Sequence, residues 1–297
     1  MNKIRIGTRT SKLALVQAQI VAEALKQKFP DLNIEIVGIK TGEEKYKKYL
    51  SRKDIFVKEI EEALIKGDID LAVHSMKDLP IQISDELVIA SVPKREDPRD
   101  AFISKKYSSL FELPKGAKIG TSSLRRRVQI LNIRPDLNVV EIRGNVDTRI
   151  KKLDILNLDA ILLAYAGLKR LGLDNIIKEI LDPDLIVPAI GQGALAIEAR
   201  KKDNEMIKIA KTIEDRESRI AIEAERIFAQ KIGGGCNLPV AAYAKVNDKE
   251  FVMSAIVAYD NEGKKVMKDK IKGNIDDALT LASKLADKLL IEDHKSE

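Results

Sequence analysis

The sequence predicts an α/β protein with two similar α/β domains and a small C-terminal α+β domain. The first observation is a short β-rich run at residues 4–6, which stops at a Gly-Thr turn and leads into apolar residues at helical spacing. The second is that this pattern begins again at residue 118. The third is a helix followed by strands after residue 215, an order typical of a separate α+β domain.

The first predicted unit alternates strands and helices. We expect strands at residues 4–6, 33–39 and 68–73. A charged stretch at 41–54, poor in apolar residues, indicates an exposed loop. Two helices are predicted from apolar residues at helical spacing: Leu13, Val16, Ile20 and Ala24 for the first, and Phe56, Ile60, Ala63 and Leu64 for the second.

The second predicted unit repeats the first. Residues 118–124 resemble residues 4–9, and the strand at 158–164 resembles the strand that ends at His74. Each unit opens with a Gly-Thr turn onto a helix N-terminus. Free backbone N–H groups and the positive end of the helix dipole favour an anion there. We therefore expect two anion-binding turns, one in each unit.

The C-terminal domain is predicted to begin with a helix from Asp215 to about Ile232. Strands are expected at 240–246 and 251–258, with a third around Val266. A final helix is predicted with Asn274 as its cap and with Asp276 and Asp277 in its first turn. Its expected apolar stripe is Ala278, Leu279, Ala282, Leu285, Ala286 and Leu289.

Composition narrows the class of protein. With 297 residues and 44% hydrophobic content, the chain can fill two or three domain cores. The start, MNKIRIGTRTSKLAL, lacks the apolar run of a secretory leader, and no window is apolar enough to span a bilayer, so we expect a cytoplasmic protein without a membrane partner. A net charge of +6, 4% aromatic residues and no Trp disfavour nucleic-acid binding.

The sole cysteine, Cys236, lies in KIGGGCNLPV behind three glycines. One Cys excludes an intramolecular disulfide, and one Cys with two His is a poor Cys/His metal site, so no metal is expected. One interpretation is a small buried hydrophobic residue. The other is a nucleophile in a loop whose missing side chains admit a large group.

Arginines gather in one segment, where residues 120–150 contain six Arg and no Lys. The planar guanidinium forms paired hydrogen bonds with carboxylate or phosphate, so this usage indicates recognition of such groups. For Arg127 and Arg134 we expect ordinary ion pairs. For the arginines beside the Gly-Thr turns we expect anion binding.

Asp78 follows a predicted strand end, where open α/β sheets place residues that contact ligands. A turn cap before Leu79-Pro80 is the alternative interpretation. His74 is expected to be a structural histidine. The glycines of Gly191-Gln192-Gly193 indicate a hinge or a close backbone approach between domains.

Nine motifs in order resemble the hydroxymethylbilane synthases, also called porphobilinogen deaminases: IGTRTSKLAL, FVKEIE, DLAVHSMKDLP, REDPRDAF, IGTSSLRRR, IRGNVDTR, AGLKRLG, PAIGQGALAIE and GGGCNLPV. The resemblance implies a monomer of three domains. Residues 1–94 with 192–211, and 98–188, would be α/β domains of the type II periplasmic-binding-protein kind. Residues 215–297 would carry the cysteine.

The resemblance also implies the chemistry. Cys236 would hold a dipyrromethane cofactor through a thioether, the substrate would be porphobilinogen, and the product the linear tetrapyrrole hydroxymethylbilane. Asp78 would be the catalytic carboxylate that stabilises positive charge on a pyrrole nitrogen. The implied cofactor-binding residues, besides Cys236, are Ser11, Lys77, Asp78, Thr121, Ser122, Ser123, Arg125, Arg126 and Arg143. The implied substrate-binding residues are Arg9, Ser11, Arg143, Arg149 and Arg170.

One segment departs from the family pattern. The family usually has Gly-Gly-Lys-Gly before FVKE, whereas this chain has Ser51-Arg52-Lys53-Asp54. The mobility of the preceding loop and the roles of Lys53 and Lys58 as substrate contacts therefore stay open. Two other functions are also weighed: a non-catalytic anion-binding module, as in solute receptors or regulator effector domains, and nucleic-acid binding through the arginines.

Overall fold

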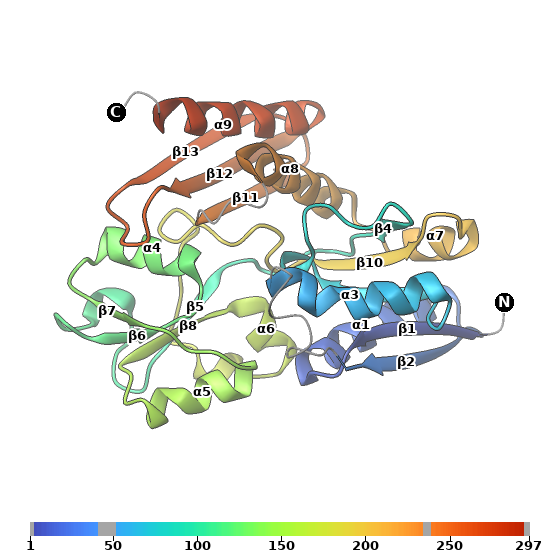
Figure 1. The fold of residues 1–297 in the computed structure, drawn as a ribbon, viewed down its shortest axis with the longest axis horizontal. Coiled ribbons are helices and arrows are strands. Elements are labelled where there is room, and N and C mark those ends of the chain that lie inside the picture. The colour runs from blue at the N-terminus through green and yellow to red at the C-terminus, as the bar shows by residue number, and fades with distance from the viewer. Residues whose placement is uncertain (1–2, 41–51, 234–238, 294–297) are drawn as a thin grey trace. The chain divides into compact units, whose positions relative to one another are not determined.

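A computed structural model describes residues 3–40, 52–233 and 239–293, with only the backbone of 52–56 and 291–293 (Figure 1). The chain divides into two compact units. Unit 1 comprises Met1–Glu96 with Ala194–Arg219, and unit 2 comprises Asp97–Gly193 with Ile220–Glu297. The three-domain division that the resemblance implies stays a prediction. In the described part of the chain, no helix is both long and apolar enough to cross a bilayer.

Unit 1 is built on a five-stranded sheet in the order β2-β1-β3-β10-β4. β1 runs parallel to β2 and β3, whereas β10 is antiparallel to β3 and β4. The chain therefore returns to this sheet late, after leaving it at β4. The strands are β1 (Lys3–Arg9), β2 (Asn33–Ile39), β3 (Leu71–Ser75), β4 (Leu87–Ser91) and β10 (Leu195–Arg200).

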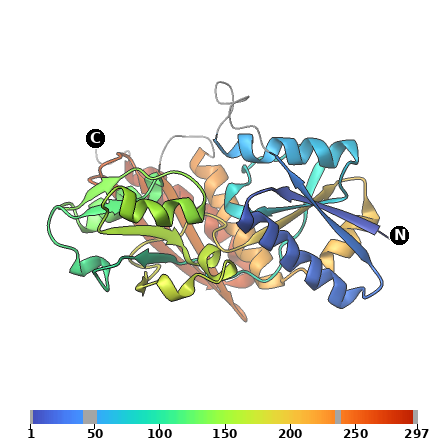
Figure 2. The same ribbon diagram turned by 90° about the horizontal axis from the view of Figure 1, so that it is seen from below.

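Helices cover both faces of this sheet, as Figure 2 shows. On one face, Val21 and Leu25 of α1 and Met206 of α7 pack into a core with the strands. On the other, Ile60 and Leu64 of α3 pack on Ala72 and Ile69. The helices are α1 (Lys12–Lys28), α3 (Arg52–Lys66), α7 (Asn204–Lys211) and the 3₁₀ turn η1 (Met76–Asp78).

Unit 2 contains a second five-stranded sheet in the order β7-β6-β8-β5-β9. β6 is parallel to β7 and β8, and β5 is antiparallel to β8 and β9, so position by position the strand directions match those of unit 1. The predicted repeat is thus confirmed in the topology. The elements are β5 (Asp100–Ile103), β6 (Lys118–Gly120), β7 (Asn138–Val140), β8 (Ala160–Ala164), β9 (Glu179–Ile180), α4 (Leu124–Ile133), α5 (Val146–Ile155), α6 (Tyr165–Arg170), η2 (Leu110–Glu112) and η3 (Asp174–Ile176).

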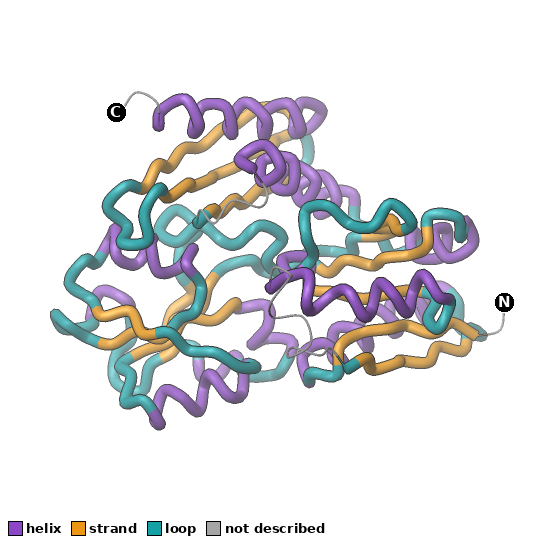
Figure 3. Tube along the Cα trace, in the orientation of Figure 1, coloured by secondary structure: helices purple, strands orange, loops and turns teal. Residues whose placement is uncertain are grey.

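The C-terminal part is the predicted α+β arrangement (Figure 3). An antiparallel sheet of β11 (Val240–Asn247), β12 (Glu250–Ala258) and β13 (Val266–Asn274) packs with α8 (Arg216–Gly233) and α9 (Ala278–Asp293). Phe228, Phe251 and Leu285 fill its core. The turn η4 (Ile275–Asp277) precedes α9, and the Asn274 side chain caps this turn by accepting from the Asp276 N–H at 3.0 Å.

Two predicted apolar faces differ from the structure. The buried face of α1 contains Ala14, Ala18, Val21 and Leu25, whereas Ile20 is 39% exposed, because the sheet lies one residue further round the helix than the predicted stripe. In α9, Leu279 is 41% exposed, while its neighbours Ala278 and Ala282 are buried. The helices were correctly predicted, but their exact inward faces were not.

Candidate active site

The first strand of unit 1 leads directly into a helix N-terminus. β1 ends at Arg9 and α1 begins at Lys12, with Ser11 as its N-cap: the Ser11 Oγ accepts from the Ala14 N–H at 3.4 Å. A hollow lies at this junction, where β1, α1 and the end of β3 meet. Its lining includes Thr8, Arg9, Ser11, Ser75 and Asp78.

Asp78 lies where the sequence predicted a ligand-contacting residue. It ends η1, directly after β3, and both it and Lys77 are half-buried. Its carboxylate therefore shares one accessible hollow with a cation, Arg9, and a hydroxyl, Ser11. Such a combination can hold an acidic substrate and stabilise a positive charge developing beside Asp78.

Gln17 is a polar residue of this hollow that sequence reasoning missed. It is 4% exposed and bonds through its Nε2 to the Ser75 Oγ at 2.8 Å. The available signal was a long polar side chain on the inward face of an otherwise apolar helix stretch. Since Ser75 ends β3, this bond fixes the backbone just before Asp78.

His74, which was expected to be a structural histidine, lies beside a buried carboxylate. Its Nε2 lies 2.9 Å from the Glu198 Oε2 on the neighbouring strand β10, and the two side chains are 4% and 0% exposed. His74 also contributes to the lining of the hollow.

In unit 2, the corresponding junction runs from β6 into α4. Thr121 is buried and its Oγ1 accepts from the Ser123 N–H at 3.2 Å, while Ser122 is half-buried. Ser123 caps α4, because its Oγ accepts from the Arg126 N–H at 3.4 Å. Ser11 and Ser123 therefore occupy equivalent N-cap positions in the two units.

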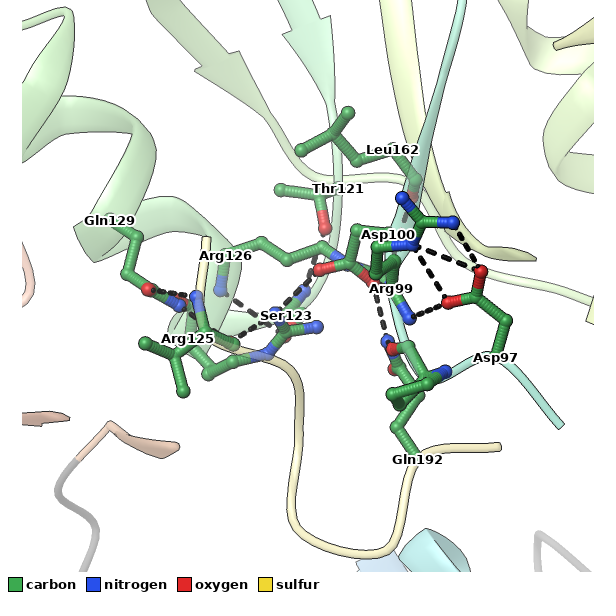
Figure 4. A network of polar contacts seen from close by, with 12 residues as sticks. Asp97, Arg99, Asp100, Thr121, Ser123, Arg125, Arg126, Gln129, Leu162 and Gln192 are labelled. Carbon is green, nitrogen blue, oxygen red and sulfur yellow. Dashed lines mark hydrogen bonds and ion pairs between the residues drawn. The ribbon is translucent and has the colours of Figure 1, made fainter. Parts of the chain in front are cut away.

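Arg125 and Arg126 converge on one carboxylate, that of Asp100 (Figure 4). Arg125 Nη1 lies 2.5 Å from Asp100 Oδ2, and Arg126 Nη2 lies 2.7 Å from Asp100 Oδ1. The three side chains are 7%, 5% and 0% exposed. Burial alone would raise the pKa of Asp100, but the charges and hydrogen bonds of both arginines lower it far below the ordinary value.

The other predicted arginines of unit 2 lie nearer the surface. Arg143 is exposed and donates to Glu141 Oε1 at 2.6 Å, and Arg149 Nε donates to the Gly144 carbonyl at 2.7 Å, next to the start of α5. Arg170 Nη2 donates to the Gly193 carbonyl at 2.7 Å. These cations therefore lie at the ends of α5 and α6.

Arg134 and Arg127 were expected to form ion pairs. Arg134 does so, since its Nη2 lies 2.7 Å from Asp136 Oδ2. Arg127 instead donates to the backbone carbonyls of Asn261 at 3.1 Å and Val139 at 3.1 Å. The ion pair expected for Arg127 is therefore replaced by bonds that join α4 to the turn before β13.

The remaining predicted positions lie partly outside the described residues. Cys236 is one of them, as are the side chain of Lys53 and residues 41–51 of the loop predicted at 41–54. Residues 52–54 of that predicted loop instead form the start of α3. Among the residues that are described, the donor set fits a carboxylate-bearing group: the buried Nε atoms of Arg125 and Arg126 have no hydrogen-bond partner there. Within the same residues, no cluster of three or more His, Cys, Asp or Glu could hold a metal ion.

The repeated sheets, with Arg, Ser and Asp at their strand ends, are typical of the class of α/β proteins that bind ligands at the carboxyl ends of their strands. Family profiles match most of the chain: "Porphobilinogen deaminase, dipyromethane cofactor binding domain" at residues 4–208, and "Porphobilinogen deaminase, C-terminal domain" at residues 219–291. The chain belongs to the porphobilinogen deaminase family.

Curated relatives agree with this assignment. The chain is 46% identical to the porphobilinogen deaminase of Trichlorobacter lovleyi, over 97% of this chain and 93% of that protein. It is 47% identical to the porphobilinogen deaminase of Bacillus velezensis, over 92% of this chain and 89% of that protein. Among solved structures, the methionine-binding protein MetQ is similar at 18% identity and a TM-score of 0.45, covering 73% of this chain and 92% of MetQ.

Proposed function

We propose that the chain performs the reaction of its family, the stepwise condensation of four porphobilinogen molecules to hydroxymethylbilane. At each step the substrate's aminomethyl group loses ammonia, a carbon–carbon bond forms, and the attacking pyrrole carbon loses its proton. After the fourth condensation, water attacks the terminal methylene carbon, supplies the hydroxyl group and releases hydroxymethylbilane. The growing chain is attached at Cys236. The proposal rests on one observation in particular: the half-buried carboxylate of Asp78 shares an accessible hollow with Arg9 and Ser11.

Asp78 is the proposed catalytic residue. Loss of ammonia places positive charge on a pyrrole nitrogen of the substrate, and the carboxylate of Asp78 accepts the hydrogen bond of that N–H group. A fixed negative charge at this point stabilises the charge as it develops. Gln17 and Ser75 keep the end of β3 in place, so that the carboxylate is positioned before the substrate arrives.

The proposed role of the cationic residues is to hold the carboxylates of the pyrroles. Each porphobilinogen brings an acetate and a propionate group, and desolvating these anions without cationic partners would be very costly. Arg125 and Arg126, with Thr121, Ser122, Ser123, Lys77 and Arg143, are assigned to the dipyrromethane, and Arg9, Ser11, Arg143, Arg149 and Arg170 to the substrate. The dipyrromethane, when bound, supplies the nucleophilic pyrrole carbon to which the first substrate is joined.

We further propose that the protein acts as a cytoplasmic monomer, with porphobilinogen as its small-molecule partner and without nucleic acid or membrane. The low aromatic content of 4% and the modest net charge of +6 support the absence of a nucleic-acid partner. Sedimentation at two protein concentrations would test the monomer.

Intact-mass measurement tests the proposed function. Protein from a host that makes porphobilinogen should exceed its sequence mass by two pyrrole units, and Cys236→Ala should lack this excess. Purified protein should consume porphobilinogen and release ammonia. An unmodified thiol, in protein that binds porphobilinogen reversibly without turnover, would instead identify an anion-binding module and overturn the proposal.

A further inference from the structure

The first turn of α4 carries cations where a helix normally disfavours them. This turn reads Leu124-Arg125-Arg126-Arg127, directly after the N-cap Ser123. The N-terminal end of a helix bears partial positive charge, so cations in the first turn are unfavourable there. Arg125 and Arg126 are also buried, which adds the cost of removing two guanidinium groups from water.

Asp100, at the start of β5, supplies the compensating charge. Each of its two oxygens accepts from one arginine, and Gln192 Nε2 donates to its Oδ1 at 2.7 Å. Because burial lowers the pKa of Arg125 while Asp100 opposes that effect, the carboxylate helps to keep this guanidinium charged. One carboxylate thus fixes the direction of both arginines.

The other groups that hold the arginines are neutral. Arg125 Nη1 donates to the Val187 carbonyl at 2.9 Å, and Arg126 Nη1 donates to the Leu162 carbonyl at 3.0 Å. The Gln129 side chain accepts from the Val187 N–H at 2.7 Å, so it holds the backbone that carries the Val187 carbonyl. Two guanidinium groups and one carboxylate leave the cluster with one uncompensated positive charge.

The cluster also has unused hydrogen-bonding capacity. Arg125 Nε and Arg126 Nε are both buried, and neither has a hydrogen-bond partner in the described part of the chain. A buried N–H group without a partner is costly, and a charged one more so. The net positive charge of the cluster and its two unused Nε–H donors therefore both match one additional anionic group with acceptor oxygens.

We propose that Asp100 is a positioning residue that holds Arg125 and Arg126 as a preformed receptor for a single carboxylate group of the bound pyrrole chain. The inference rests on the proposed function for the identity of that carboxylate. It goes further by assigning a role to Asp100 and by fixing how many anions the arginine pair takes. Without Asp100, the pair would carry two uncompensated charges and would take a second anion in its place.

Thermal unfolding of the full-length chain, produced in a host that makes no porphobilinogen, tests this role without the enzymatic reaction. Asp100→Asn keeps the side-chain shape but removes the charge, and should lower the unfolding midpoint in sodium chloride by roughly 10 °C. In sodium acetate of equal ionic strength, the midpoint of Asp100→Asn should rise by more than that of the unchanged protein, because acetate replaces the missing carboxylate.

The matched control is Asp136→Asn, which removes a carboxylate from the half-buried pair with Arg134 in the same unit. Its midpoint should be equally insensitive to acetate and to chloride. A purely structural Asp100 would give an Asp100→Asn midpoint that falls by the same amount in both salts, and that result would overturn the proposal.

A charge-balanced variant covers the case in which Asp100→Asn fails to fold. The double variant Asp100→Asn with Arg126→Gln restores one net positive charge and should regain a folded state with a higher midpoint than Asp100→Asn alone. A double variant that unfolds at or below the temperature of Asp100→Asn would contradict the charge-balancing role. A failed mass test at Cys236 would refute the proposed function and leave these stability results unaffected.

Discussion

The two five-stranded sheets have the same strand order and directions, yet their strand-end sites are built differently. In unit 1, the N-cap Ser11 is followed by Lys12, Leu13 and Ala14, and the junction stays open as the hollow that contains Asp78. In unit 2, the equivalent N-cap Ser123 is followed by Leu124, Arg125 and Arg126, and the two arginines are buried against Asp100.

The difference extends to the fourth strand of each sheet. Leu195 of β10 pairs with Ser75, the last residue of β3, whereas Asp100 of β5 pairs with Ala164, the last residue of β8. The same backbone position is thus apolar in one unit and acidic in the other. The comparison teaches that the shared topology places the same strand-to-helix junction in both units, while a few residues decide whether the junction stays an open hollow or is filled by a buried Arg–Asp cluster.

Removing the acidic group of unit 2 should have the largest effect on folding. Asp100→Asn should cost about 3–5 kcal/mol at pH 7, because it leaves two buried guanidinium groups without their counterion. The pKa of Asp100 is lower in the folded than in the unfolded state. The Asp100 carboxylate therefore contributes its full stabilisation above the unfolded pKa of about 4, and this stabilisation is lost as the pH falls below that pKa.

Urea unfolding at pH 7 and at pH 3 measures this dependence. The stability difference between the unchanged protein and Asp100→Asn should be smaller at pH 3 than at pH 7. An equal difference at both pH values would show that the Asp100 charge contributes nothing to the stability of unit 2.

The corresponding change in unit 1 should affect turnover and leave folding nearly intact. Asp78→Asn removes the carboxylate from the open hollow and should reduce kcat by about 100- to 1,000-fold, the range for losing one charge-stabilising group. Its unfolding midpoint should stay close to that of the unchanged protein, because Asp78 is half-buried. Porphobilinogen consumption and thermal unfolding measure the two properties.

Asp85→Asn is the control for Asp78→Asn, since Asp85 is an exposed carboxylate in the same unit. It should leave both kcat and the midpoint unchanged. Full activity in Asp78→Asn would remove the distinction drawn between the two strand-end sites.

Two glycines with positive φ, one in each unit, allow the cost of an added Cβ to be compared. Gly263 has φ +77°, and a Cβ there would lie 2.3 Å from the Val128 carbonyl oxygen of α4. Gly67, just after α3, has φ +82°, and nothing in the described part of the chain lies within 4 Å of its Cβ position. Gly67→Ala should therefore cost about 1 kcal/mol from backbone strain, and Gly263→Ala about 2–4 kcal/mol, because the contact with α4 must also open.

Denaturant unfolding of both glycine variants measures the difference. The Gly263 turn is further held by Asn132 Nδ2, which donates to the Gly263 carbonyl at 2.9 Å, and by Arg127. Equal costs at the two glycines would mean that this turn does not support α4 and its arginine pair.

Much of the fold was predictable because its signals are local. The strand at 33–39 was predicted at both ends, and the Gly-Thr turns correctly placed the two N-capped helices. The inward face of α1 was not predictable from spacing alone, since Leu13, Val16 and Ile20 also recur at helical intervals, and only the position of the sheet decides between the two stripes.

The site shows the same limit. The position of Asp78 just after β3 was predictable, because strand ends in open α/β sheets are recognisable in a sequence. Asp100 was missed, because its bonds to Arg125 and Arg126 cross 25 and 26 residues and depend on β5 returning antiparallel beside β8. The arginines indicated that an anion binds them, but the sequence does not show that the first such anion is a side chain of the protein itself, Asp100.

The smallest effect should come from the more solvent-accessible ion pair of unit 2, between Arg134 and Asp136. Arg134 lowers the pKa of Asp136 by hydrogen bonding, so this contribution too is present above the unfolded pKa and lost as the pH falls. Asp136→Asn should nevertheless leave the unfolding midpoint almost unchanged, because solvent screens the pair and Arg134 keeps its hydrogen bonds to the carbonyls of Leu110 and Leu113. If thermal unfolding gave Asp136→Asn a loss as large as that of Asp100→Asn, burial would not be what makes the Asp100 carboxylate valuable.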